Sequence, residues 1–145
     1  MSKTFTLAEA QTLLPVLEAL LRRTLAAGAR AGARELEMQR LNQRIYLSGG
    51  MHVNVGEAAR CRADLEKAVE EAKDTLAEME EIGVQVKDME QGLLDFPCVM
   101  EGRTVLLCWK LGEKEIAYWH SLEDGFAGRK PLDGRLGKTE KERLN

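Results

Sequence analysis

The side chains with the chemistry of a binding site gather in the second half of the chain. Carboxylate, thiol and imidazole groups occur there at Asp88, Asp95, Cys108, Glu115 and His120. Ionised carboxylates, thiolates and imidazoles all bind Zn²⁺, Fe²⁺ and related divalent ions. The sequence therefore suggests a site for a divalent transition metal or a small ligand, with Asp95, Cys108, His120 and Glu115 as its candidate residues.

Two arginines near this group are candidate contacts for an anion, Arg103 and Arg129. Arg129 closes a compact glycine-containing turn, residues 125–129, whose backbone donors could surround an anion. The turn lacks the strand, Gly-Lys-Ser and helix context of a phosphate loop. A loop packed on a sheet through Phe126 is the favoured interpretation.

Simpler roles exist for the same residues. His120 can be a core histidine hydrogen-bonded to backbone or to Asp95, and Cys108 a small buried hydrophobe. Asp95 lies inside the apolar run 93–99 and needs a partner if it is buried. The three residue types also occur in thiol nucleophiles, but reactive cysteines seldom lie in the middle of a strand.

The residues that must position this group alternate between short apolar runs and turns. Runs at 84–87, 93–100, 103–111 and 116–122 are rich in β-branched and aromatic residues, which predicts a small antiparallel sheet of three to four strands. A two-residue turn at Glu101 and Gly102 places Asp95 opposite Cys108 on one face.

The next turn, residues 112–115, decides where His120 points. If residues 113 and 114 centre it, Cys108 faces Trp119 and His120 lies on the other face of the sheet. A slip by one residue brings Cys108 opposite His120. Convergence of the candidate ligands thus depends on this register.

Two helices precede the sheet. Thr6 and Glu9 form a capping box before an apolar period of threes and fours, which predicts one helix to about residue 46, bent but not ended by Pro15. A loop containing His52, expected to be exposed, leads to a second helix that ends before Gly83. We expect an α+β fold in a single domain, 1–145: a long antiparallel helical hairpin at 6–82, a sheet region at 84–132 and a charged tail at 133–145.

Charge supports the pairing of the helices. Residues 7–46 hold six arginines and four glutamates, whereas residues 57–82 hold four basic and nine acidic side chains. The surplus apolar stripe on these helices predicts a homodimer or a larger homo-oligomer. The formal charge of −3 and an acidic sheet region do not fit nucleic-acid binding, although Trp109, Tyr118 and Trp119 could stack on bases.

The composition also bears on location. We expect no membrane association, because no apolar run approaches the length of a bilayer-spanning helix. The N-terminus resembles no signal peptide, and the three cysteines lack disulfide or zinc-knuckle spacing. A cytoplasmic protein with reduced thiols is predicted.

Several motifs together carry a family resemblance. They are Thr6–Ala10 with Leu13-Leu14-Pro15, Gly83–Asp88, Gly92–Pro97, Leu107–Glu113, Tyr118-Trp119-His120 and Gly125–Arg129. Nearly the whole chain resembles the bacterial family known as domain of unknown function 2203, and the resemblance implies no particular activity. From the residues we expect a non-catalytic binding or assembly module that self-associates through its helices. The alternative is a metal- or ligand-binding protein with its site around Asp95, Cys108 and His120.

Overall fold

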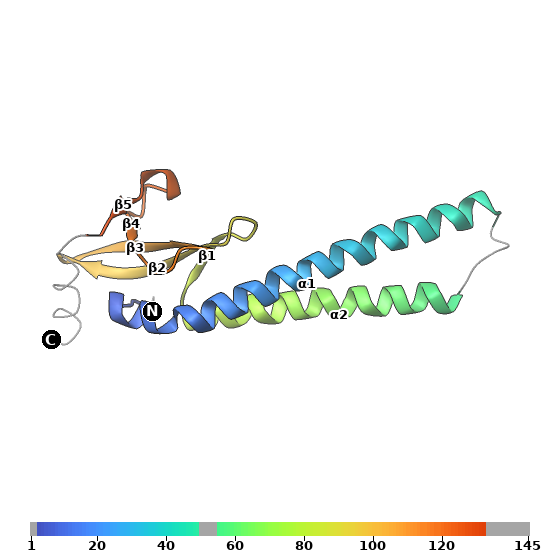
Figure 1. Cartoon of the computed structure of the whole chain (residues 1–145), viewed down its shortest axis with the longest axis horizontal. Helices are drawn as coiled ribbons and strands as arrows, with labels where there is room; N and C mark the ends of the chain where they lie inside the picture. Colours follow the sequence, from blue (N-terminus) through green and yellow to red (C-terminus); the bar gives the residue numbers. More distant parts are fainter. Residues whose placement is uncertain (1–2, 50–54, 133–145) are drawn as a thin grey trace. The chain divides into compact units, whose positions relative to one another are not determined.

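A computed structural model describes residues 3–49 and 55–132 (Figure 1). Two helices precede a sheet, which confirms the α+β class. The elements are α1 (Leu7–Leu47), α2 (Val55–Ile82), β1 (Gln85–Asp88), β2 (Leu93–Met100), β3 (Arg103–Lys110), β4 (Tyr118–His120), the short 3₁₀ helix η1 (Phe126–Gly128) and β5 (Lys130–Pro131). His52 and the charged tail lie outside the described residues.

The chain divides into two compact units. One contains residues up to Leu21 and from Ala77 onward, and the other contains Arg22–Leu76. The change from helix to strand that the sequence predicts near residue 83 is present, since α2 ends at Ile82 and β1 begins at Gln85. The boundaries between the two units lie within the helices, so that the first turns of α1 and the last of α2 fall in the same unit as the sheet.

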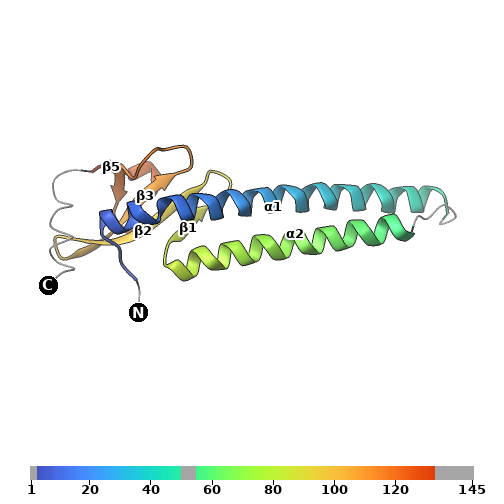
Figure 2. The ribbon, with the colours of Figure 1, turned by 60° about the horizontal axis from the view of Figure 1, so that its bottom comes forward.

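The unit Arg22–Leu76 is an antiparallel pair of helical segments, drawn side by side in Figures 1 and 2. The buried hydroxyls of Thr24 and Thr75 lie 2.6 Å apart. Further along, Arg30 pairs with Glu71. Residue numbers increase along α1 from Thr24 to Arg30, while the residue numbers of their partners on α2 decrease from Thr75 to Glu71. The two helices are therefore antiparallel, as the predicted hairpin requires.

In the other unit, the start of α1 packs on one face of the sheet. The predicted capping box is present: Glu9 N donates to Thr6 Oγ1 at 3.1 Å, and Thr6 N donates to Glu9 Oε1 at 2.9 Å. The helix continues through Pro15. Just before the helix, Phe5 meets Phe96 edge to face with ring centroids 5.7 Å apart. That contact places the segment just before α1 on the Phe96 face of the sheet.

The sheet has five antiparallel strands in the order β1-β2-β3-β4-β5. This is more than the three to four predicted, because Lys130 and Pro131 pair with β4 although their segment shows no strand periodicity. The predicted turn at Glu101 and Gly102 is present, with φ of 52° and 78°. It pairs Asp95 with Cys108, as predicted.

The pairing of β3 with β4 differs from both predicted registers. Cys108 lies opposite Tyr118, and Leu106 lies opposite His120. The connection between the strands is longer than a four-residue turn, since β3 ends at Lys110 and β4 begins at Tyr118. The correction places His120 on the same face as Cys108, not on the opposite face expected for a turn centred at residues 113 and 114.

Among the described residues, neither α1 nor α2 contains a stretch apolar and long enough to span a membrane.

Candidate functional site

Three chemically reactive side chains point to one face of the sheet, from three adjacent strands. Phe96 faces Phe5, which lies two residues before α1. Its neighbour Asp95 points to the other face, because side chains alternate along a strand. Cys108 is paired with Asp95, and His120 is paired with Leu106, two residues before Cys108. The register therefore brings the side chains from β2, β3 and β4 to one point.

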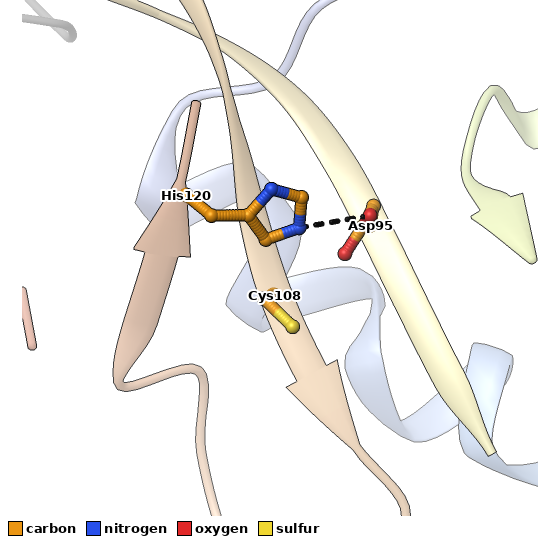
Figure 3. Close-up of side chains that lie close together, drawn as sticks. All are labelled: Asp95, Cys108 and His120. Carbon is orange, nitrogen blue, oxygen red and sulfur yellow. Dashed lines mark hydrogen bonds and ion pairs between the residues drawn. The ribbon is translucent and has the colours of Figure 1, made fainter. Parts of the chain in front are cut away.

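Figure 3 shows this group, the Asp-Cys-His cluster, defined as Asp95, Cys108 and His120. One ligating atom from each residue lies within 4.8 Å of the others. The residues are only 2%, 1% and 3% exposed, respectively. A carboxylate, a thiol and an imidazole are thus held together away from bulk water.

The hydrogen bonds of His120 fix which ring nitrogen carries a proton. Nδ1 lies 2.8 Å from the carbonyl oxygen of Ser121, and a carbonyl only accepts, so Nδ1 is the donor. Nε2 lies 3.1 Å from Asp95 Oδ2. A hydrogen bond there needs one further proton, on the imidazole or on the carboxyl group. Without that proton, a lone pair of Nε2 would face a lone pair of Oδ2. A cation can occupy the space between these two atoms.

The Cys108 thiol is protonated in this environment. Burial, followed by the negative charge of Asp95, raises its pKa from 9.0 to about 11, although the nearby Arg129 guanidinium acts in the opposite direction. A thiol with so high a pKa is a poor nucleophile at neutral pH. The raised pKa therefore argues against the thiol-nucleophile alternative for Cys108.

Arg129 is held in place from several sides. It makes a two-fold contact with Glu113, NH1 to Oε1 at 3.2 Å and NH2 to Oε2 at 2.8 Å. Its guanidinium carbon lies 4.0 Å from the centroid of the Tyr118 ring and 4.4 Å from that of Phe126. These contacts hold the η1 segment against the sheet. They also occupy part of the guanidinium group, so fewer of its donors remain for the predicted anion contact.

A pocket of about 440 Å³ opens beside the cluster. Its inner wall contains the three cluster residues with buried Leu93 and Leu106. Its outer lining comes from two segments of chain, the end of β1 with the following turn and the connection from β4 into η1. These segments contribute Lys87, Asp88, Gln91, Leu122, Glu123, Asp124, Gly125 and Phe126.

The structure brings some of the sequence candidates together and separates others. Asp88 lines the pocket with the cluster. Glu115 is exposed in the connection between β3 and β4, and Arg103 is exposed at the turn end of β3. Neither residue lines this pocket.

Glu113 is the residue that sequence reasoning missed. Besides holding Arg129, its carboxylate accepts from Lys110 N at 2.8 Å, and its carbonyl accepts from Trp109 Nε1 at 3.0 Å. In the sequence it is one of two acidic residues in the turn 112–115. Only its contact with Arg129, a residue 16 positions later in the sequence, distinguishes it.

The comparisons with known proteins concern the family alone. A family model described as an uncharacterized conserved protein, DUF2203, matches residues 3–132. Searches of curated proteins and of solved structures each find no match. Since the family model covers most of the chain, including every residue of the cluster, the chain belongs to the DUF2203 family.

Proposed function

We propose that this protein binds a divalent transition metal ion through Asp95, Cys108 and His120. The observation that supports the proposal is the convergence of three different, buried ligating atoms within 4.8 Å of one another. Oxygen, sulfur and nitrogen donors together suit Zn²⁺, Fe²⁺ or Co²⁺ better than Mg²⁺ or Ca²⁺, which prefer oxygen.

The size of the cluster is close to what such an ion needs. With metal–ligand distances near those of zinc, ligand atoms in a tetrahedral site lie about 3.3–3.8 Å apart. The Asp95 to His120 distance, 3.1 Å, is already that short. Atoms at the 4.8 Å limit need to close by about 1 Å, which side-chain rotation can supply.

The hydrogen bond from His120 Nδ1 to Ser121 favours the same role. Histidine ligands usually donate their second ring N–H to a carbonyl or carboxylate, which fixes the ring and leaves the other nitrogen for the metal. Here that nitrogen is Nε2, which faces Asp95.

Three protein ligands leave one position of a tetrahedral ion for water or another ligand. All three residues line the pocket. The proposed metal centre therefore resembles sites whose fourth ligand can exchange, rather than structural sites with four protein ligands.

The test begins with elemental analysis of protein purified without a metal-affinity tag. We expect about one equivalent of a transition metal, or its uptake by protein stripped with EDTA. With Co²⁺, coordination by Cys108 gives a thiolate-to-metal charge-transfer band. Cys108→Ala and His120→Ala should abolish stoichiometric binding, whereas Cys98→Ala, at another buried cysteine of the sheet, should retain it. Uptake equal in all these proteins would refute the site.

We also propose self-association through the helical unit. Three apolar side chains at the end of α1 and the start of α2 are strongly exposed: Tyr46 at 84%, Leu47 at 73% and Val55 at 71%. Exposed apolar groups of this kind are characteristic of interfaces. Across a two-fold axis, the arginine-rich α1 of one copy can meet the acidic α2 of another.

A cytoplasmic location is part of the proposal. All three cysteines, Cys61, Cys98 and Cys108, are buried as free thiols. Free thiols suit a reducing compartment.

A further inference from the structure

We infer that Arg129 is a positioning residue of the proposed metal centre. Its guanidinium group holds the sulfur atom of Cys108 and reduces the electron density that this sulfur donates to the ion. The inference rests on the proposed function and concerns a residue outside the set of three ligands.

Arg129 lies on the face of the sheet that carries the Asp-Cys-His cluster. Cys108 is paired with Tyr118 across β3 and β4. Paired residues of antiparallel strands direct their side chains to the same face. The guanidinium carbon of Arg129 is 4.0 Å from the centroid of the Tyr118 ring. The guanidinium group therefore stacks on the side chain that neighbours Cys108.

The guanidinium group has donors for the sulfur atom. One N–H group on each terminal nitrogen contacts Glu113, at 3.2 and 2.8 Å, and the other N–H groups remain for a second acceptor. That acceptor is Cys108, with which Arg129 interacts through a side-chain hydrogen bond and through its charge. An ionised acceptor strengthens a hydrogen bond, so this contact is stronger when Cys108 binds an ion as a thiolate.

The position of Arg129 is fixed by the strands of the cluster. Its side chain is only 17% exposed. The carboxylate of Glu113, which holds the guanidinium group, also accepts from the backbone N of Lys110, two residues after Cys108 in β3. The Phe126 ring adds a further contact, at 4.4 Å from its centroid. A planar guanidinium group held by a carboxylate and by aromatic rings is a preorganised donor.

A donor at the sulfur changes the electronic properties of a metal centre. Hydrogen bonds to ligating sulfur atoms tune the redox potentials of iron–sulfur and copper sites, because they withdraw electron density from the sulfur. The same contact lowers the energy of the sulfur lone pairs. The positive charge of Arg129 would by itself repel a cation, but its pairing with Glu113 compensates that charge.

The first test uses the full chain loaded with Co²⁺. Arg129→Met keeps an unbranched side chain but removes the donors and the charge, so the thiolate-to-metal charge-transfer band should move to lower energy. Phe126→Leu is the matched control, because it removes one stacking contact of Arg129 and retains the guanidinium group. It should leave the band in place. An unchanged band in Arg129→Met, or an equal shift in both variants, would refute the inference.

The second test detects the contact in EDTA and needs no variant of Arg129. The Nε–Hε signal of Arg129, assigned through the backbone, is followed by ¹⁵N NMR. Cys108→Ala should shift this signal, whereas Cys98→Ala, at another buried cysteine, should not. A signal that stays in place in Cys108→Ala would show that Arg129 does not hold the sulfur.

The two proposals fail in different ways. If the wild type takes up no Co²⁺, the metal site is refuted and the role of Arg129 in it is refuted as well. If the wild type binds Co²⁺ with a charge-transfer band that Arg129→Met does not move, the metal site stands and only the role of Arg129 is refuted.

Discussion

Asp95 and His120 depend on each other at the scale of single residues. Both are almost fully buried, and each is the other's hydrogen-bond partner at 3.1 Å. Asp95→Ala leaves a buried ring nitrogen without that partner, so we expect it to destabilise the metal-free protein by about 3 kcal/mol. Asp95→Asn should cost less, because the amide can donate to Nε2. Urea unfolding in EDTA measures both.

The effect of Asp95→Asn on metal binding should differ from its effect on stability. A neutral amide is a weak ligand for a transition metal, so Asp95→Asn should weaken Co²⁺ uptake strongly while it retains most of the stability. If the two variants lost stability equally, the hydrogen bond to His120 would not be the main role of Asp95 in the fold.

Cys108 gives the protein a dependence on pH in the alkaline range. Its pKa is about 11 in the folded protein and 9.0 as the ordinary value. Because the folded state favours the neutral thiol, this contribution to stability is complete below pH 9 and is lost as the pH rises toward 11. Its upper limit is about 2–3 kcal/mol.

Cys108→Ser removes the titration at nearly constant volume. The stability of the wild type should therefore fall more steeply than that of the variant between pH 9 and 11, since other groups titrate alike in both. Urea unfolding of metal-free protein at intervals across this range measures the difference. Parallel curves would show that Cys108 ionises as readily in the folded protein as in the unfolded chain.

At the scale of elements, the turn between β2 and β3 sets the register on which the cluster depends. Gly102 has a φ of 78°, and a Cβ added there meets nothing within 4 Å. Gly102→Ala should therefore cost about 1 kcal/mol through backbone strain alone. Gly125, with a φ of −98° and equally open surroundings, is the matched control, and Gly125→Ala should be nearly neutral. Thermal unfolding distinguishes the two, and equal effects would argue against strain at the turn.

The same turn explains how much of the site was predictable. Glu101 and Gly102 form a two-residue connection, and such a connection leaves one register, so the pairing of Asp95 with Cys108 followed from the sequence. The connection before β4 is longer and depends on Glu113, whose side chain folds back to Lys110 and Arg129. No local pattern encodes those contacts. Two registers were therefore predicted for the pairing of β4, which carries His120, with β3. The structure has a third.

The strand β5 was missed for a related reason. Lys130 and Pro131 are exposed and have no alternation of apolar and polar residues. Their pairing with β4 follows a segment held by Arg129 against Glu113, Tyr118 and Phe126. Long-range contacts of this kind determine the strand, whereas the helices follow from capping and periodicity in their own sequence.

At the scale of the whole molecule, the proposed self-association should appear in the mass of the protein in solution. A single chain has a mass of 16.2 kDa, so light scattering at micromolar concentration should give at least twice that value. Tyr46 and Leu47 are among the most exposed large apolar side chains described, and a second copy that covers them removes apolar surface from water. The double variant Tyr46→Ser, Leu47→Ser should shift the protein toward the single-chain mass.

Leu122→Ser provides the control, because Leu122 is also exposed, at 61%, but belongs to the unit with the sheet. It should leave the mass unchanged if association uses the helices. A wild-type mass of one chain at all accessible concentrations would refute self-association and leave the metal site unaffected, since all three proposed ligands come from one chain. The two proposals thus concern different units, and each can be tested without the other.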